Sequence, residues 1–174
     1  MENCNPVSTP AACDVKLEEN DGSKPVDAKL YQSIIGSLLY AAVSTRPDIA
    51  ETVGVLSKFN SYPSQTHLTA ARRVLRYLKG TQDLGLVYRK QGKSLYGYTD
   101  ADYASSADRH SKSGAVFIHP GGPVSWCSKR QSIIALSTAE SEYIALFDGV
   151  VECMVTSVTV RYWSPTIDSH HHSC

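Results

Sequence analysis

Apolar residues recur every three or four positions through the first half of the chain, which predicts amphipathic helices. The first helix is expected to run from Tyr31 and to stop before Ser44, because the approach to Pro47 disfavours helical geometry. Pro47 itself suits the first turn of a second helix. A third helix is expected from about His67 to Lys79, with Gly80 as its C-cap.

Beyond Gly80 the pattern changes to short apolar runs separated by turn residues, which predicts strands. We expect strands at residues 84–88, 95–99, 113–118, 124–127 and 133–136, with turns at residues 91–94 and 120–122. A last apolar stretch predicts a helix from near Ser137 to about Val155. Helices followed by strands and one more helix indicate an α+β fold.

Two carboxylates stand at the expected ends of these elements. The strand at residues 95–99 leads directly to Asp100, and Ser137 precedes Glu140 by the three residues of a capping box. Glu142 lies about 200° around the helix from Glu140 and faces the other way. Because Mg²⁺ usually rests on one or two carboxylates plus substrate phosphate, Asp100 and Glu142 are candidate metal ligands. Their structural alternatives are a turn former and a solvated helix residue.

The chain has 174 residues, 42% of them hydrophobic, and a formal net charge of +0. A neutral chain argues against a surface that binds nucleic acids strongly. The charge is unevenly distributed, however, since Asp83 is the only acidic residue among the many cations of residues 66–93. Four cations share one face of the third predicted helix, which is either a nucleic-acid contact or a solvated surface: Arg72, Arg73, Arg76 and Lys79.

The five cysteines are widely scattered and lack the paired spacing of a zinc site or a disulfide framework. They fit a reducing compartment, so we expect a cytoplasmic or nuclear protein. The first residues lack the basic and apolar regions of a signal peptide. No run of the sequence is expected to be long enough for a transmembrane helix, so no membrane partner is expected.

Eight short motifs occur in an order that is recognisable as a whole. The second half of the chain contains Tyr98-Thr99-Asp100-Ala101-Asp102-Tyr103-Ala104, Lys112-Ser113-Gly114, Val124-Ser125-Trp126, Ser128-Lys129-Arg130-Gln131 and Leu136-Ser137-Thr138-Ala139-Glu140-Ser141-Glu142-Tyr143. The first half contains Gly36-Ser37-Leu38-Leu39-Tyr40, Thr45-Arg46-Pro47-Asp48-Ile49 and Arg76-Tyr77-Leu78-Lys79-Gly80-Thr81. The later motifs resemble the ribonuclease H domain of Ty1/copia-type retrotransposon polyproteins. The earlier ones resemble the segment that joins reverse transcriptase to that domain.

The resemblance implies a ribonuclease H-like fold, a mixed sheet with helices. It also implies an enzyme that cleaves the RNA strand of RNA–DNA hybrids with two Mg²⁺ ions. It implies that Asp100 bridges the ions and that Glu142 supports one of them. The family's next strand ends in a third Asp, which this sequence does not match, since Asp168 is the only Asp after Val150 and its surroundings differ. We therefore expect a truncated domain with impaired cleavage. The short His tract at residues 170–172 is expected to be a polar tail rather than a metal site.

These assignments divide the chain into four parts. An extended lead-in (residues 1–28) precedes a helical segment like the reverse transcriptase connection (residues 29–82). A truncated ribonuclease H-like domain (residues 83–155) and an unaligned tail (residues 156–174) follow.

A second hypothesis comes from a different class of protein. Arg73-Val74-Leu75-Arg76 fits the Arg-x-Leu-Arg tetrapeptide of the RxLR effectors that oomycete plant pathogens secrete. Short reading frames of this kind resemble proteins grouped with those effectors. The resemblance implies a secreted protein that binds a host plant protein in the host cytoplasm or nucleus and suppresses defence or cell death. The tetrapeptide also lies in the predicted helix that carries the retrotransposon-like motif starting at Arg76, so retrotransposon ancestry explains it without secretion.

Overall fold

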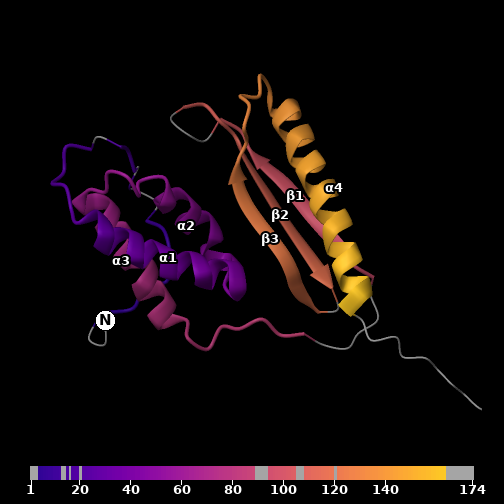
Figure 1. Cartoon of the computed structure of the whole chain (residues 1–174), viewed down its shortest axis with the longest axis horizontal. Coiled ribbons are helices and arrows are strands. Elements are labelled where there is room, and N and C mark those ends of the chain that lie inside the picture. Colours follow the sequence, from indigo (N-terminus) through magenta and orange to yellow (C-terminus); the bar gives the residue numbers. More distant parts are fainter. Residues whose placement is uncertain are drawn as a thin grey trace, which may run out of the picture. The chain divides into compact units, whose positions relative to one another are not determined.

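The computed structural model describes residues 4–12, 15, 17–19, 21–88, 94–104, 108–119 and 121–163. The chain divides into two compact units, residues 1–88 with 126–129 and residues 89–125 with 130–174. Helices build the first unit, and a sheet with one long helix forms most of the second (Figure 1). The expected α+β class is confirmed. Asp168 and residues 170–172, and most of the turn expected at residues 91–94, fall outside the described residues.

The three helices expected in the first half are present. They are α1 (Ala28–Ser44), α2 (Ala50–Ser57), which the short 3-10 helix η1 (Pro47–Ile49) precedes, and α3 (Gln65–Gly80). The α1 helix begins earlier than its apolar pattern indicated, because the Asp27 side chain accepts a hydrogen bond from the Lys29 N–H and caps it. The expected C-cap at Gly80 is wrong, since Gly80 is still helical and Thr81 is the capping residue.

The core of the first unit forms where the apolar faces of α1, η1, α2 and α3 meet. Its largest fully buried apolar members are Tyr31, Ile35, Leu38, Ile49, Leu56, Val53 and Val74. The Tyr31 hydroxyl is buried in this core and donates to the Leu56 carbonyl at 2.8 Å. Burial disfavours the charged form of Tyr31 and raises its pKa to about 12.

The lead-in is extended, as expected, but it is anchored to the start of α3. Ser64 caps that helix in a capping box with His67, whose ring stacks on Phe59 with centroids 3.9 Å apart. The Ser64 hydroxyl donates to Asp21 in the lead-in at 3.0 Å. Hydrogen bonds from the hydroxyl and amide of Ser23 hold the pKa of Asp21 well below its ordinary value. The lead-in residue Asp21 is thus part of the hydrogen-bonded cap of α3.

The second unit contains a three-stranded antiparallel sheet in the order β1-β2-β3. The strands are β1 (Tyr96–Asp102), β2 (Lys112–His119) and β3 (Gly122–Arg130), and Thr99 of β1 lies opposite Ala115 of β2. The expected hairpin between β2 and β3 is confirmed, and Gly121 supplies the positive φ of 82° that its tight turn needs.

Two further strands were predicted wrongly. Residues 84–88 and 133–136 have no strand conformation. Both runs alternate loosely in sequence, but a strand exists only where a neighbour takes up its backbone hydrogen bonds. Neither run has a neighbouring strand among the described residues. The sheet is therefore smaller than the alternation pattern indicated.

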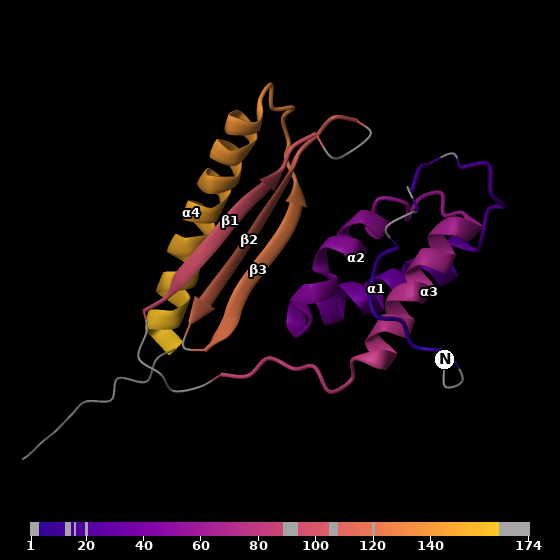
Figure 2. The same cartoon turned by 180° about the vertical axis from the view of Figure 1, so that it is seen from behind.

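The long helix α4 (Thr138–Trp163) packs on one face of the sheet, over β1 and β2 (Figures 1 and 2). It continues beyond Val155, the end expected from sequence. Its sheet-facing side is made of small residues, with Ser141 and Ala145 buried. At Gly149 an added Cβ would overlap the Thr99 side chain, so the helix and the strand are in close contact there.

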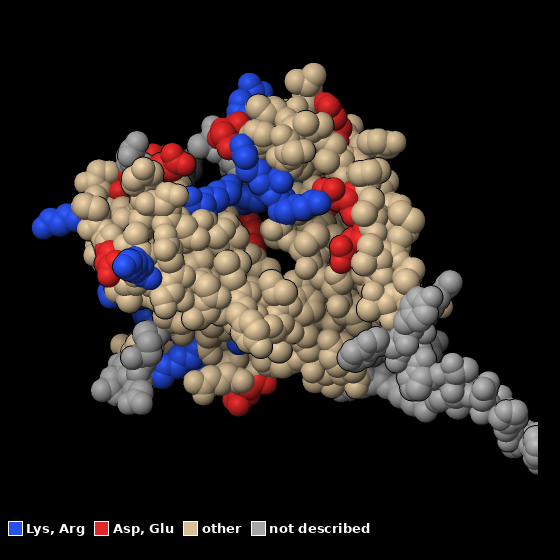
Figure 3. Space-filling view, viewed as in Figure 1, with Lys and Arg blue, Asp and Glu red and all other residues tan. Residues whose placement is uncertain are grey.

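The remaining surface of α4 is largely apolar and exposed. Thr138–Val160 is long and apolar enough to cross a membrane by length and composition alone, with a mean hydropathy of 1.5, and 17% of it is buried. The expectation that no run is long enough for a transmembrane helix was therefore wrong. The acidic and hydroxyl residues within this stretch interrupt its apolar run in the sequence, although its mean hydropathy is high. The part of Figure 3 that corresponds to α4 is mostly tan, with few charged atoms.

Candidate functional site

The first candidate carboxylate, Asp100, belongs to β1 but does not end it, because the strand continues to Asp102. Side chains alternate along a strand, and Thr99 faces α4, so Asp100 lies on the opposite face of the sheet. Exposed residues occupy that same face, including Tyr98 and Asp102, and Asp102 pairs with Lys112 at 3.7 Å. Asp100 is itself exposed and accessible to solvent.

The start of α4 assigns different roles to its two glutamates. The Glu140 N–H donates to the Ser137 hydroxyl at 3.1 Å, and the Glu140 carboxylate accepts from the Leu136 N–H at 2.7 Å. Glu140 therefore helps to cap the helix, although it reaches one residue further back than a capping box requires. Glu142 is exposed and has no part in this cap.

The buried side chain of Gln131 links the neighbours of Asp100 and Glu142. Gln131 is buried and its Nε2 donates both to the Ser141 carbonyl at 2.9 Å and to the Ser113 hydroxyl at 3.0 Å. Ser141 precedes Glu142, and Ser113 pairs with Ala101, the residue after Asp100. The Gln131 side chain therefore ties the first turn of α4 to β2 at Ser113. Sequence reasoning quoted Gln131 only as part of a motif and missed this positioning contact.

The two carboxylates leave the sheet on opposite faces. Glu142 belongs to the helix on one face, and Asp100 points to the other. Among the described residues β1 ends the strand order, so its outer edge is where the two faces meet. Hard cations need several oxygen ligands, and two exposed carboxylates can supply part of such a set. No cluster of three or more His, Cys, Asp or Glu side chains suited to a metal occurs within the described residues.

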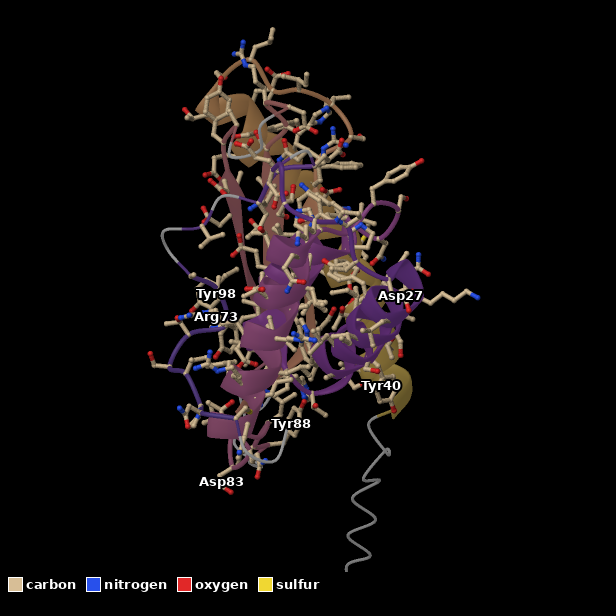
Figure 4. The ribbon with its side chains drawn as sticks, turned by 90° about the vertical axis from the view of Figure 1, so that its left-hand side faces the viewer. Asp27, Tyr40, Arg73, Asp83, Tyr88 and Tyr98 are labelled. Carbon is tan, nitrogen blue, oxygen red and sulfur yellow. The ribbon has the colours of Figure 1, made fainter. Side chains whose placement is uncertain are left out.

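The cationic face of α3 is occupied by the lead-in. Arg73, labelled in Figure 4, donates to the carbonyl and hydroxyl of Thr9 at 3.2 and 2.8 Å. Arg76 donates to the Asn5 carbonyl at 2.6 Å, and Lys79 to the Cys4 carbonyl at 3.0 Å. Arg72 is exposed. Three of the four cations that were candidates for nucleic-acid contact thus bind the chain's own backbone.

The same contacts involve the RxLR-like tetrapeptide Arg73–Arg76 and determine which of its side chains are accessible. Its two arginines, Arg73 and Arg76, hold the lead-in, while Val74 is buried in the core and Leu75 packs against it. The lead-in also passes close to the end of the helix, because a Cβ added at Gly80 would lie 2.9 Å from the Pro6 Cβ. The tetrapeptide is therefore part of a folded helix, and the extended lead-in lies across it.

A network that sequence reasoning missed joins two of the quoted motifs. Arg46 pairs with Asp48 at 2.7 Å and donates to the carbonyl and hydroxyl of Thr81 at 3.1 and 2.6 Å. The Tyr77 hydroxyl donates to Asp48 at 2.8 Å. Hydrogen bonds from Arg46 keep the pKa of Asp48 below its ordinary value, and the Asp48 carboxylate raises the pKa of Tyr77. The Thr45–Ile49 and Arg76–Thr81 motifs are therefore spatial neighbours.

Comparisons with known proteins agree on the origin of this chain. It is 46% identical over 152 residues to a retrovirus-related Pol polyprotein from transposon TNT 1-94 of Nicotiana tabacum, and 41% identical over 174 residues to that from transposon RE1 of Arabidopsis thaliana. These matches include 83% and 96% of this chain. They span only 11% and 12% of the two polyproteins.

A shorter relative is covered almost completely. The chain is 47% identical over 133 residues to secreted RxLR effector protein 161 of Plasmopara viticola. This match spans 75% of this chain and 94% of that protein. No family model and no solved structure matches the chain. The polyprotein relatives match over most of its length and include the motifs of both units. The chain belongs to the family of Ty1/copia-type retrotransposon Pol polyproteins.

Proposed function

We propose that this chain is a ribonuclease H-like segment of a retrotransposon polyprotein whose ancestral activity is Mg²⁺-dependent cleavage of RNA in RNA–DNA hybrids, and that it cleaves poorly by itself. The observation that carries the proposal is that Asp100 on β1 and Glu142 near the start of α4 are both exposed, and that Gln131 joins Ser141, the neighbour of Glu142, to Ser113, which lies opposite Ala101. The family relationship supports it, because the motifs around these two carboxylates lie within the matched region.

The impairment follows from the number and geometry of the carboxylates. Two Mg²⁺ ions normally clamp the attacking and leaving oxygens of a phosphodiester. Asp100 and Glu142 would hold an ion between them only around the β1 edge, with substrate phosphate and water completing its oxygen ligands. Asp168, the only Asp after Val150, does not match the third family position. The two residues therefore supply a weak site.

Cleavage of a labelled RNA–DNA hybrid with Mg²⁺ or Mn²⁺ tests the proposal. We expect slow, metal-dependent cleavage that Asp100→Asn and Glu142→Gln each abolish. Asp102→Asn is the matched control, because Asp102 is on the same face of β1 and pairs with Lys112 instead. Cleavage that survives both substitutions would exclude this site. Cleavage by this chain as fast as cleavage by a longer segment of a polyprotein relative would refute the impairment.

A second candidate function rests on the effector relative. The chain covers 94% of a protein named as a secreted RxLR effector, at 47% identity. Under this alternative the chain is secreted and acts on a host plant protein in the cytoplasm or nucleus to suppress defence or cell death. Expression in plant cells, scored for suppression of induced cell death, tests it. Suppression that Asp100→Asn leaves unchanged would favour the effector function over nuclease activity.

A further inference from the structure

The start of the lead-in is an uncharged segment that lies on a cationic helix face. Residues 3–13 contain no charged side chain, and residues 65–80, which form α3, contain neither Asp nor Glu. At 100° per residue, the four cations of α3 share an arc of about 120°. Their contacts to the lead-in are backbone oxygens and one hydroxyl. Neither segment therefore supplies the negative charge that would match this face.

Thr9 is the lead-in residue whose side chain reaches these cations. Its hydroxyl accepts a hydrogen bond from Arg73 Nη2 at 2.8 Å, and its carbonyl accepts from Arg73 Nε at 3.2 Å. Arg73 lies on the side of α3 along which the lead-in runs (Figure 4). A guanidinium has five N–H donors, so these two contacts use only part of its capacity. An anion attached to the Thr9 oxygen would already be within reach of Arg73.

The neighbouring arginines turn this single contact into a cluster. Arg76 follows Arg73 by three residues, a spacing at which side chains are neighbours on a helix, and it donates to the Asn5 carbonyl at 2.6 Å. Arg72 precedes Arg76 by four residues and is exposed. The planar donor fork of arginine matches the oxygens of a phosphate, and clusters of arginines bind phosphorylated side chains.

Thr9 is also accessible and is followed by proline. Both Ser8 and Thr9 are exposed. Pro10 fixes its own φ and keeps the preceding residue out of helical geometry, so Thr9 is presented in an extended segment. An exposed, extended Thr–Pro pair is the pattern that proline-directed protein kinases recognise. Ser164-Pro165 is the other Ser/Thr–Pro pair of the sequence, and it lies outside the described residues.

We propose that Thr9 is a phosphorylation site of a proline-directed protein kinase, and that Arg73 and Arg76 hold the phosphate and thereby fasten the lead-in to α3. The modified residue and the arginines belong to the same compact unit. Phosphorylation would keep the cationic face of α3 covered. The proposal depends neither on hybrid cleavage nor on the effector alternative.

The transfer is an ordinary phosphoryl transfer from ATP. The Thr9 oxygen attacks the γ-phosphorus, and the bond from that phosphorus to the β,γ-bridging oxygen breaks, so ADP leaves. The proton of the hydroxyl passes to a carboxylate base of the kinase. The lead-in is held by few contacts, so local opening releases it to the kinase without unfolding of the helices.

The modified lead-in gains more than it loses. Thr9 gives up the hydrogen bond that its hydroxyl donates to the Ala11 carbonyl at 2.9 Å, because a phosphate ester oxygen carries no proton. Ala11 is exposed, so water takes the place of that donor. The phosphate brings a charge of about −1.5 to −2 and three strong acceptor oxygens. Its hydrogen bonds to guanidinium groups are charge-assisted and stronger than the neutral contact that they replace.

Incubation of the purified full chain with a mitogen-activated protein kinase and Mg-ATP tests the modification. Mass spectrometry of its peptides should place a phosphate on Thr9, and Thr9→Val should remove that phosphate. Ser8→Ala is the matched control, because Ser8 is equally exposed but is not followed by proline. It should leave the phosphate on Thr9. A chain that acquires no phosphate on Thr9 overturns the proposal.

A chemically defined phosphoprotein tests the role of the arginines. Because Cys13 follows Ala12, a synthetic peptide of residues 1–12 with phosphothreonine at position 9 can be ligated to residues 13–174 to give the full chain. Proteinase K should remove its lead-in about tenfold more slowly than that of the unphosphorylated chain made in the same way, because cleavage needs local opening. Circular dichroism checks that all chains fold alike.

The same ratio of cleavage rates in two variants identifies the contact. In Arg73→Gln the phosphate should have almost no effect, whereas Arg109→Gln, which changes an exposed arginine of the second unit, should keep the tenfold ratio. An equal ratio in Arg73→Gln would mean that the phosphate hinders the protease directly, and it would overturn the proposal. Faster removal of the phosphorylated lead-in would also overturn it, since the phosphate would then expel the segment.

Discussion

Replacing Asp48 by Asn removes one charge from the network that ties the α1–α2 junction to the end of α3. In the native chain the Asp48 carboxylate pairs with Arg46 and accepts from the Tyr77 hydroxyl. Arg46 would keep its bonds to Thr81 but would lose its anion. A guanidinium with little access to water would then have only neutral partners, so the first unit should become less stable.

The size of the effect follows from the burial of the pair. The side chain of Arg46 is 11% exposed and that of Asp48 is 33% exposed. Breaking a fully buried pair by removing one partner costs about 3–5 kcal/mol, and an exposed pair contributes only about 0.2–1 kcal/mol. The Asn side chain also keeps an acceptor for Tyr77. We therefore expect Asp48→Asn to lower the free energy of unfolding by about 2 kcal/mol at neutral pH.

The pH dependence of this loss has a definite sign. The Arg46 guanidinium holds the pKa of Asp48 below its ordinary value in the folded chain. A carboxyl of this kind stabilises fully above its unfolded pKa, and the stabilisation is lost as the pH falls through the folded pKa. The difference between wild type and Asp48→Asn should therefore be complete at neutral pH and disappear in strongly acid solution.

Urea unfolding followed by far-ultraviolet circular dichroism measures the difference, and hydrogen exchange of the α3 amides assigns it to the first unit. Asp83→Asn is the control, because Asp83 is exposed and lies just beyond the same helix. It should change the free energy of unfolding by less than about 0.5 kcal/mol. Equal stability of wild type and Asp48→Asn at neutral pH, or a difference that persists in strong acid, would refute the reasoning.

Three further predictions concern other contacts. Deleting residues 1–11 should free Arg73, Arg76 and Lys79 and so strengthen binding to an RNA–DNA hybrid with a steeper salt dependence, measured by fluorescence anisotropy; unchanged binding would show that these cations do not contact nucleic acid. Gly149→Ala should destabilise the second unit by about 1–3 kcal/mol in urea, because its Cβ overlaps Thr99, whereas Gly36→Ala, which meets open space, should not destabilise the chain. Ser64→Ala should cost about 1 kcal/mol or more through loss of the α3 cap, and a smaller loss would mean that Asp21 and His67 hold the helix start without it.

The features that could be predicted from the sequence are local ones. Helical spacing depends on residues three or four positions apart, so α1, α2 and α3 could be recognised from their own residues. The β2–β3 hairpin could be recognised from the glycines of its turn, and the role of Glu140 from its distance to Ser137. In each case the interacting groups are close in sequence.

The features that could not be predicted depend on distant partners. Residues 84–88 alternate like a strand but have no neighbouring strand in the part of the chain that the structure describes, and alternation alone does not reveal this. The cations of α3 looked like a solvated or nucleic-acid-binding face, because a backbone carbonyl carries no signal in the sequence. The residue types of Asp100 and Glu142 were evident, but their opposite faces of the sheet follow from the contact between Thr99 and Gly149.

The lead-in runs antiparallel to α3, and this has a consequence for the order of folding. Its contacts start with Cys4 at Lys79 and Asn5 at Arg76, continue with Thr9 at Arg73, and end with Asp21 at Ser64. The first of these contacts joins residues 75 positions apart. Closing loops of this length costs entropy before any contact is gained. The lead-in, although it is synthesised before α3, is therefore among the last parts of this unit to find its place.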